Sequence, residues 1–288
     1  MKLIKYFIEF IIIIFFFIVI RLFGLKISQS IFGFIFKNIG PLFRSKKILN
    51  YNLSLALPNI DKLKRDKIID NMWANYGKIF SEYMFIKKFR GNSKFSEKII
   101  IENQKELEKI KSQKKPVIFI SGHFNNFELM AMHLERSNIN LAAVYRPLNN
   151  KFLNPIMEKI RKKYICKKQI KKGISGTKEL LKEFKNGTSI ALMIDQRVSE
   201  GIKCDFFGKE ALTTTIPAQF VKKFNSSVVP IYVERLIDNT FKLKIYESLK
   251  FSNEETIDSI TKKLNKVLEK MIMSNPDQWI WTHNRWKI

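Results

Sequence analysis

A histidine and a glutamate with four residues between them, His123 and Glu128, have side chains suited to proton transfer. A carboxylate bonded to one imidazole nitrogen fixes the ring tautomer and stabilises the imidazolium, so that the other nitrogen can take up a proton. On one continuous helix the two side chains would point about 140° apart, because each residue turns the helix by about 100°. They can converge if His123 lies on a turn and Glu128 in the first helical turn. The pair is therefore a candidate general base with its carboxylate, and a structural histidine is the alternative.

The residues around this pair predict a strand, a turn and a helix. Residues 117–120 are β-branched or aromatic, which is typical of a buried parallel strand, and Ser121-Gly122 interrupts the run. From Phe127 onward apolar residues recur at helical spacing. His123 is thus expected where the carboxyl end of a strand meets a helix, the edge at which open α/β sheets bind ligands.

Ionisable residues also follow two other predicted strands. Buried strands are expected at residues 139–145 and 188–194; Arg146 follows the first, and Asp195 and Arg197 follow the second. Core packing does not require ionisable groups at these positions, whereas a fold that builds its site at strand ends does. These side chains are therefore predicted to gather near the histidine.

Strands and helices alternate over most of the chain at the spacing of βαβ units. No internal repeat and no linker interrupts them, so the predicted fold class is α/β, with a single mixed, mostly parallel sheet flanked by helices. Residues 46–89 read as helical throughout. Further strands are expected at residues 99–102, 228–233 and 241–246, and further helices at 156–164, 175–185, 216–224 and 254–273.

The N-terminal segment is apolar over residues 3–25, which is long enough to span a bilayer at about 20 residues. Residues 21–26 are bulky and basic rather than small, which favours an uncleaved anchor over a removed signal peptide. More positive charge follows this segment than precedes it, which predicts a cytoplasmic location for the rest of the chain. We expect a transmembrane or membrane-anchoring helix at 1–26, an interfacial segment at 27–45 and a cytoplasmic domain at 46–288.

The 288 residues include 52 Lys and Arg against 26 Asp and Glu, a net charge of +26. Such an excess indicates a polyanionic partner, either nucleic acid, an anionic membrane or an acidic substrate, with a compositional bias toward lysine as the alternative. The apolar anchor and the lack of a nucleic-acid-binding motif argue against nucleic acid. Cys166 and Cys204 are too few for a disulfide framework, and no metal-ligand spacing is present. His133 is expected to be a solvated or capping residue.

Four motifs, in order along the chain, resemble those of the lipid A late acyltransferases, the lauroyl and myristoyl transferases of Gram-negative inner membranes. These enzymes belong to the wider glycerolphosphate acyltransferase-like group, which carries a His-x4-Asp/Glu motif. The stretch from His123 to Glu128, His-Phe-Asn-Asn-Phe-Glu, is similar to the family's His-Phe-Gly-Asn-Trp-Glu. The other matches are residues 144–150 with the family's Tyr-Arg-Pro segment, Asp195-Gln196 followed by Phe206-Phe207-Gly208 and Thr213-Thr214, and the aromatic, basic tail at 278–287.

The match has departures at three places. Asn125 stands where the family has Gly, and Phe127 stands where it has Trp. After Asp195 the family's charged group is replaced by Gln196-Arg197. These changes bear on how closely backbone amides approach the substrate and on recognition of the acceptor.

The resemblance implies a membrane-bound O-acyltransferase of the inner membrane. It would transfer a fatty acyl chain from acyl carrier protein to a hydroxyl on a 3-hydroxyacyl chain of a Kdo-bearing lipid A precursor. His123 would be the general base assisted by Glu128, and amides after Gly122 would hold the oxyanion. No cofactor and no metal would be needed. The implied partners are acyl carrier protein, the lipid A precursor and anionic membrane lipid, but not nucleic acid.

The remaining candidate residues are assigned to substrate binding or to support of the site. Arg146 would hold Glu128 or a substrate oxygen, or else form a structural ion pair. Asp195 and Arg197 would bind the headgroup or build the site, and Thr213 and Thr214 would start a phosphate-binding helix or simply cap it. Asn126 belongs to the matched motif and is expected to support the site. The alternatives are an acyltransferase for another glycolipid or glycerolipid and, more remotely, a basic membrane-associated binding protein without catalysis.

Overall fold

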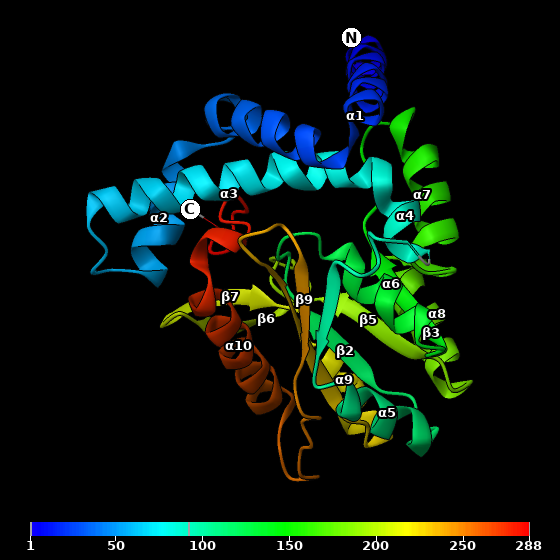
Figure 1. The fold of residues 1–288 in the computed structure, drawn as a ribbon. Helices are drawn as coiled ribbons and strands as arrows, with labels where there is room; N and C mark the ends of the chain where they lie inside the picture. Colours follow the sequence, from blue (N-terminus) through cyan, green and yellow to red (C-terminus); the bar gives the residue numbers. More distant parts are fainter. Residues whose placement is uncertain (1, 92, 288) are drawn as a thin grey trace.

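The computed structural model describes residues 2–91 and 93–287, and its centre is a seven-stranded sheet (Figure 1). The strand order is β1-β9-β8-β2-β5-β3-β4, and every neighbouring pair is parallel except β8 and β9. Two further strands form a separate antiparallel hairpin. The sheet consists of β1 (Ile99–Glu102), β2 (Ile118–Ser121), β3 (Leu141–Tyr145), β4 (Lys168–Lys171), β5 (Ser189–Met193), β8 (Val228–Arg235) and β9 (Phe241–Ile245), and the hairpin of β6 (Ile202–Phe206) and β7 (Lys209–Thr213).

Helices precede, connect and follow these strands, as expected for an α/β protein. Short 3-10 turns lie at Gly40–Leu42, Tyr83–Phe85 and Pro276–Gln278. The helices are α1 (Lys2–Ile39), α2 (Lys46–Ala56), α3 (Lys62–Glu82), α4 (Ile86–Arg90), α5 (Gln104–Gln113), α6 (Glu128–Arg136), α7 (Leu153–Tyr164), α8 (Ile174–Lys185), α9 (Ile216–Phe224) and α10 (Ile257–Ser274).

The central strand β2 is buried along its whole length and contributes to two separate cores. Successive side chains of a strand point to opposite faces of the sheet. Phe119 therefore packs in a core with α1, α4, α5, α6 and α7, whereas Ile118 and Ile120 pack in a core with α8, α9, α10 and the C-terminal tryptophans. This double covering explains the continuous apolar run that predicted the strand.

Helix α1 has two parts that differ in their surroundings. Gly24 has a φ of 77°, a backbone conformation that glycine adopts readily, and it bends the helix there. Figure 1 shows the N-terminal part projecting from the body and the C-terminal part lying along α3. A Cβ atom added to Gly77 of α3 would lie 1.9 Å from the carbonyl oxygen of Phe32, so the close packing of the two helices requires glycine there.

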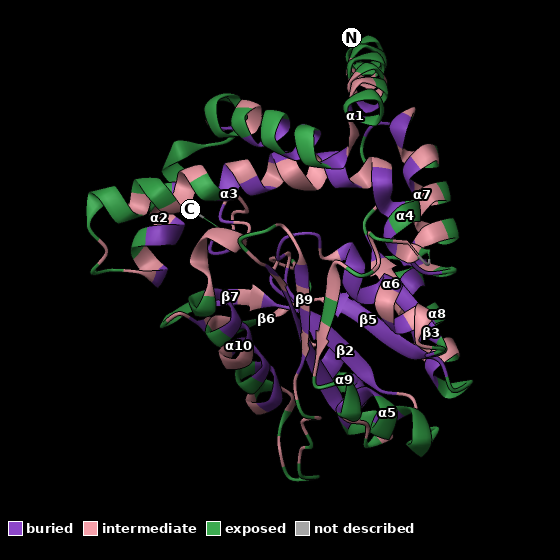
Figure 2. Cartoon of the chain, in the orientation of Figure 1, coloured by how far each residue is buried: buried purple, intermediate pink, exposed green. Residues whose placement is uncertain are grey.

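The N-terminal part of α1 is mostly exposed in the structure (Figure 2). The segment Lys2–Leu42 is long and apolar enough to cross a membrane by length and composition, with a mean hydropathy of 2.7 over its most apolar window. Beyond Gly24 the segment predicted to be interfacial keeps an exposed apolar side at Ile27, Ile31 and Phe34. The extent of the anchor and the interfacial segment remains a prediction.

The predicted fold class is confirmed, with three local corrections. The strand β4 was not predicted, because only Ile170 of its Lys-Gln-Ile-Lys sequence is buried. The β6–β7 hairpin was also not predicted. Residues 46–89 are not helical throughout, since residues 57–61 separate α2 from α3 and a 3-10 turn separates α3 from α4.

Candidate active site

His123 lies just beyond the carboxyl end of β2, and its closest polar partner is Asp195, which follows β5. The ring Nδ1 of His123 is 2.8 Å from Oδ1 of Asp195, and the His123 backbone N–H donates to Oδ2 of the same carboxylate at 2.8 Å. The indole N–H of Trp279 also donates to Oδ2, at 2.9 Å. Because β2 and β5 are parallel neighbours, they bring these two residues to the same edge of the sheet.

Asp195 is ionised at neutral pH. Its side chain is fully buried, which alone would raise the pKa. The positive charge of His123 and the hydrogen bonds from His123 and Trp279 outweigh burial and lower the pKa of Asp195 to about 2. An ionised carboxylate keeps the ring proton on Nδ1 and leaves Nε2 as the nitrogen available for proton transfer.

Glu128 belongs to a second ion pair. Its Oε1 accepts a hydrogen bond from Nε of Arg161 at 2.8 Å and another from the Tyr83 hydroxyl. Burial alone would lower the pKa of Arg161, but the charge of Glu128 raises it above its ordinary value. Among the described residues no hydrogen bond or ion pair joins Glu128 to His123, so the structure gives no support to the predicted role of Glu128 in orienting the ring. Glu128 begins α6 and is bonded to α7, whereas Asp195 comes from the neighbouring strand.

A cavity of about 450 Å³ opens beside the two ion pairs at the carboxyl ends of β2, β5 and β3. His123, Glu128 and Arg161 all line it, and the Phe127 ring packs edge-on against His123 with 4.7 Å between ring centres. Its apolar wall comes from Met130, Ala131, Ala143, Ala191, Leu192 and Met193, and its polar wall includes Arg44, Arg146, Gln169, Lys172 and Gln196.

The predicted residues Arg146 and Thr214 also line this cavity. Arg146 is exposed, and it pairs with no carboxylate among residues 2–91 and 93–287, so the ion pair expected with Glu128 is not formed. The Thr214 hydroxyl accepts a hydrogen bond from the N–H of Ile216 at 3.4 Å, while the N-cap residue of α9, Thr215, makes no side-chain capping bond. Arg197 is half-buried and does not line the cavity.

Thr213 has a structural environment away from the cavity. Its hydroxyl donates to the carbonyl of Ala211 at 3.0 Å and accepts hydrogen bonds from Arg285 at 2.7 Å and Asn265 at 3.3 Å. The side chain is buried at the end of β7 and holds the C-terminal segment against the hairpin. This arrangement does not support a direct phosphate-binding role for Thr213.

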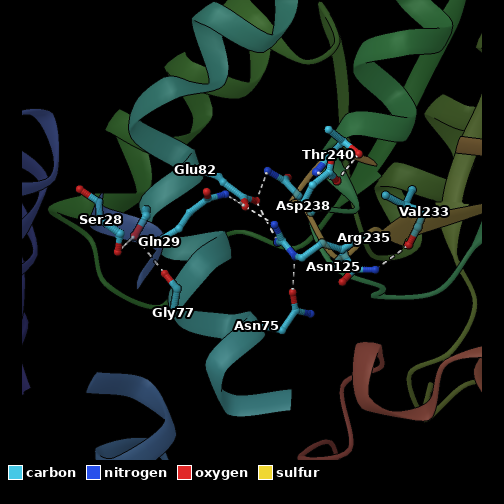
Figure 3. A network of polar contacts seen from close by, with 12 residues as sticks. Ser28, Gln29, Asn75, Gly77, Glu82, Asn125, Val233, Arg235, Asp238 and Thr240 are labelled. Atoms are coloured by element: carbon cyan, nitrogen blue, oxygen red, sulfur yellow. Dashed lines mark hydrogen bonds and ion pairs between the residues drawn. The ribbon is translucent and has the colours of Figure 1, made fainter. Parts of the chain in front are cut away.

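Asn125 explains how the chain replaces the glycine of the family motif. It has a φ of 45°, in the left-handed region that asparagine tolerates better than other side chains. Its side-chain amide donates to the carbonyl of Val233 at 2.8 Å (Figure 3). The same amide donates to Oε1 of Gln278 at 2.6 Å. Its backbone N–H donates to the carbonyl of Gln278. The substitution therefore keeps the required backbone conformation and adds two anchors for the loop.

Asn126 joins this loop to a buried ion pair between Glu82 and Arg235 (Figure 3). Its side-chain amide donates to Oε2 of Glu82 at 3.0 Å, while Gln29 of α1 donates to Oε1 at 2.7 Å. Arg235 also donates through Nε to Asn75 at 2.8 Å. Asn126 is therefore bonded to the buried ion pair behind the loop and does not line the cavity.

Three backbone amides after Gly122 are already bonded. Those of His123, Phe124 and Asn125 donate to Asp195, to the carbonyl of Gly122 and to the carbonyl of Gln278, respectively. They cannot also stabilise an oxyanion without losing these bonds. Backbone amides that could stabilise the oxyanion are therefore limited to those of the residues that start α6.

The sequence reasoning missed the partners that complete the site. Arg161 lies in the lysine-rich helix α7, where it reads as one more surface cation, and Tyr83 lies at the end of a helical run. Trp279 belongs to the matched C-terminal tail, which was the only signal for it. Glu82 and Arg235 are 153 positions apart in the sequence, and neither falls in a matched motif.

The fold and site define an α/β protein with a histidine–aspartate pair beside a cavity at the carboxyl edge of a mostly parallel sheet. Comparison with known proteins assigns the chain to a family. The family model for bacterial lipid A biosynthesis acyltransferases matches residues 1–288, so the chain belongs to that family of acyltransferases, as the four motifs predicted.

Curated relatives share this family at low identity. Lipid A biosynthesis acyltransferase 2 of Shigella flexneri is 23% identical over 250 residues, covering 84% of this chain and 78% of the relative. The lipid A biosynthesis lauroyltransferase of Escherichia coli (strain K12) is 24% identical over 85% of this chain and 79% of its own length. The lipid A biosynthesis myristoyltransferase of the same strain is 22% identical over 80% and 71%, respectively.

Proposed function

We propose that this acyltransferase moves a fatty acyl chain from acyl carrier protein to a hydroxyl on a 3-hydroxyacyl chain of a Kdo-lipid A precursor. The single observation that carries the mechanism is the His123–Asp195 pair beside the cavity. The pair engages Nδ1 of the ring and leaves Nε2 as the nitrogen that can accept a proton, which is the arrangement of a general base.

In the proposed reaction, Nε2 of His123 removes the proton from the acceptor hydroxyl as the oxygen attacks the thioester carbonyl. The tetrahedral intermediate then expels the thiolate, which takes the proton from the imidazolium, so the base is restored. Asp195 remains ionised throughout and stabilises the imidazolium. This assignment replaces Glu128 as the carboxylate partner of the base.

Glu128 acts through Arg161 in this proposal. Nη1 of Arg161 is buried and has no hydrogen-bond partner within the described part of the chain, although the side chain lines the cavity. A buried donor without a partner is costly, so a substrate oxygen is a suitable acceptor for it. Arg161 is therefore proposed to bind the developing oxyanion, together with amides at the start of α6.

The cavity walls suit the two parts of the proposed substrates. Apolar residues such as Met130, Leu192 and Met193 accommodate the acyl chain, and the basic side chains of Arg44, Arg146 and Lys172 face anionic headgroup atoms. An acyltransferase for another glycolipid or glycerolipid remains the alternative, because cationic residues recognise the phosphate of either class of acceptor.

Mass spectrometry of lipid A from cells with and without the protein tests this function. We expect cells without it to lack one secondary acyl chain, which wild-type protein restores and the His123→Ala variant does not. The purified protein should form the same product from acyl carrier protein thioester and a Kdo-lipid A precursor. If lipid A were unchanged and a glycerolipid were altered instead, the acceptor would be that glycerolipid and the proposed lipid A acceptor would be wrong.

We also propose that the N-terminal part of α1 anchors the enzyme in the inner membrane, with the catalytic domain on the cytoplasmic side. Phe17 and Ile20 of α1 are buried in the core and the C-terminal part of α1 packs on α3, so a test should remove only residues 2–15 and leave the packed part in place. The shortened protein should remain folded and move largely to the soluble fraction on sedimentation. Retention of all the shortened protein on membranes would show that the exposed apolar side beyond Gly24 is sufficient for attachment.

A further inference from the structure

A buried ion pair lies behind the catalytic turn, residues 122–126, and takes no part in the proton transfer described above. Glu82 of α3 is fully buried, and Arg235, at the end of β8, is 7% exposed. Nη1 and Nη2 of Arg235 each donate to one carboxylate oxygen of Glu82, the second at 3.2 Å. The cost of taking two charges out of water offsets most of the attraction between them, so such a pair adds little to stability. Stability alone therefore does not account for this pair.

Glu82 is the polar anchor of Asn126 in the catalytic turn. Nδ2 of Asn126 donates to Oε2 of Glu82 at 3.0 Å, whereas Oδ1 of Asn126 is buried without a hydrogen-bond partner in the described part of the chain. The Asn126 carbonyl accepts the N–H of Leu129 at 3.0 Å, so the amides that start α6 move with this residue. A shift of Asn126 would therefore displace both His123, three positions before it, and the amides proposed to bind the oxyanion.

Arg235 fastens the other side of the same turn through Gln278. The backbone N–H of Arg235 donates to Oε1 of Gln278 at 3.0 Å, and Nε2 of Gln278 donates to the Arg235 carbonyl at 2.9 Å. Gln278 in turn accepts a hydrogen bond from Asn125, and the next residue, Trp279, donates to Asp195. The ion pair and Asp195 are therefore both bonded to the short segment that contains Gln278 and Trp279.

The carboxylate of Glu82 also contacts α1. Gln29 of α1 is 3% exposed and donates from Nε2 to Oε1 of Glu82 at 2.7 Å (Figure 3). Gln29 lies beyond the bend at Gly24, in the half of α1 that packs on α3, and the exposed apolar side of that half lies on the opposite side of the helix. One carboxylate therefore joins the catalytic turn to the segment of α1 that is predicted to be interfacial.

We propose that Glu82 is a positioning residue for acyl transfer, which ties the catalytic turn to the half of α1 that is docked on α3. This inference rests on the proposed function, because that function places the base in the turn. Glu82 does not line the cavity, and it acts through Asn126. Loss of this anchor leaves the cavity walls that bind substrate in place but shifts the base and the oxyanion donors. A misplacement of about 1 Å can lower a rate about 100-fold.

Two double variants test whether the turn requires the hydrogen-bond acceptor at position 82. The first variant, Glu82→Met with Arg235→Met, removes both charges and also the acceptor of Asn126. The second variant, Glu82→Gln with Arg235→Met, removes both charges but keeps an acceptor oxygen. Neither variant leaves an unpaired buried charge, which is the change that most endangers folding. Circular dichroism and the midpoint of unfolding check that both variants fold.

We expect kcat of the first variant to fall about 10- to 100-fold, while KM for either substrate changes less than about threefold. The second variant should keep kcat within about threefold of the wild type, because Asn126 retains its acceptor. Hydrogen exchange of residues 122–130 gives a readout that needs no substrate, and these amides should exchange faster in the first variant than in the second. Equal kcat in the two variants would overturn the positioning role of Glu82.

A matched pair of single variants tests the link to α1. Gln29→Met removes the bond from α1 to Glu82. Ser81→Ala removes a neighbouring buried bond between the same helices, which the Ser81 hydroxyl donates to the carbonyl of Ser28 at 3.1 Å. We expect kcat to fall about 3- to 10-fold in Gln29→Met and to be unchanged in Ser81→Ala, with similar decreases in the midpoint of unfolding. Equal kcat in these two variants would overturn the link to α1.

The proposed function and this inference can fail separately. A wild type that is inactive with acyl carrier protein thioester and a Kdo-lipid A precursor would overturn the proposed function. The exchange comparison would still decide the role of Glu82, since equal exchange in the two double variants would overturn it and faster exchange in the first would support it. An active wild type with equal kcat in the two double variants would overturn this inference alone.

Discussion

Two carboxylates flank the cavity, and their partners give them different chemistry. Asp195 holds the imidazole ring of His123, a group that can both accept and donate a proton, whereas Glu128 holds Arg161, which stays protonated. The first pair can therefore take part in proton transfer, and the second can only fix a positive charge in place. The spacing of the His-x4-Glu motif brings both residues to the cavity without making them partners.

The largest expected effect comes from removing the base. His123→Ala should lower turnover by about 100- to 10,000-fold, the usual worth of acid–base catalysis. The only other side chain bonded to Asp195 within the described part of the chain is Trp279, and its indole N–H cannot accept a proton. Steady-state rates with the proposed substrates measure the effect, and circular dichroism checks the fold. His133→Gln on α6 is the control histidine, and its rate should be unchanged. A fully active His123→Ala variant would refute the assigned base.

A smaller effect is expected from Asp195→Asn, which breaks the same pair without changing its shape. The amide cannot stabilise the imidazolium by charge and can hold the wrong ring tautomer, so turnover should fall about 100- to 1,000-fold. Trp279 still has an acceptor oxygen in this variant, so the fold should persist. Steady-state measurement of kcat for the variant and the wild type would show the change.

Glu128→Gln should have a milder effect, about 10-fold on kcat. Glutamine can still accept from Arg161 and Tyr83, but it loses the charge that keeps the guanidinium in position. KM for the acyl donor should change little, because the affected group acts on the developing charge. If Glu128→Gln proved more damaging than Asp195→Asn, the motif glutamate would be the partner of the base during turnover.

The fold was predictable where burial leaves a mark on local sequence. The strands β2, β3 and β5 are apolar along their length because helices cover both faces of the sheet. The strand β4 lies at the edge and exposes its two lysines, so its sequence resembles a charged loop. The hairpin of β6 and β7 has a similar mixture of buried and exposed residues.

The site was predictable in position but not in its pairing. Because His123, Arg146 and Asp195 each follow a predicted strand, they were expected at the same edge of the sheet. All three lie there in the structure. Which of these residues are in contact depends on the spatial order of the strands in the sheet, β2-β5-β3. That spatial order cannot be read from the order of the strands along the chain. The same limit hid Arg161, whose partner depends on how α7 packs beside α6.

The smallest effect concerns stability rather than turnover, at His133 on α6. Burial and the nearby charge of Arg136 lower the pKa of His133 to about 4. The side chain is half-buried, and its ring contacts the Ser137 hydroxyl at the end of α6 at 3.4 Å. In the unfolded chain the His133 ring takes up a proton as the pH falls through about 6.5, whereas in the folded protein it stays neutral down to about pH 4. Protonation therefore favours the unfolded state, so the free energy of unfolding decreases as the pH falls from about 6.5 to 4.

Replacing this histidine with Gln should remove that part of the pH dependence. We expect the wild type to lose about 1 kcal/mol more than His133→Gln in the free energy of unfolding between pH 7 and pH 5, after allowance for partial exposure of the ring. Urea titrations of the detergent-solubilised protein at both pH values measure the difference. His283 also has a pKa lowered to about 4, so the stability of the variant should still decrease as the pH falls, but less steeply than that of the wild type. Identical slopes in the two proteins would show that His133 is accessible to protons in the folded state.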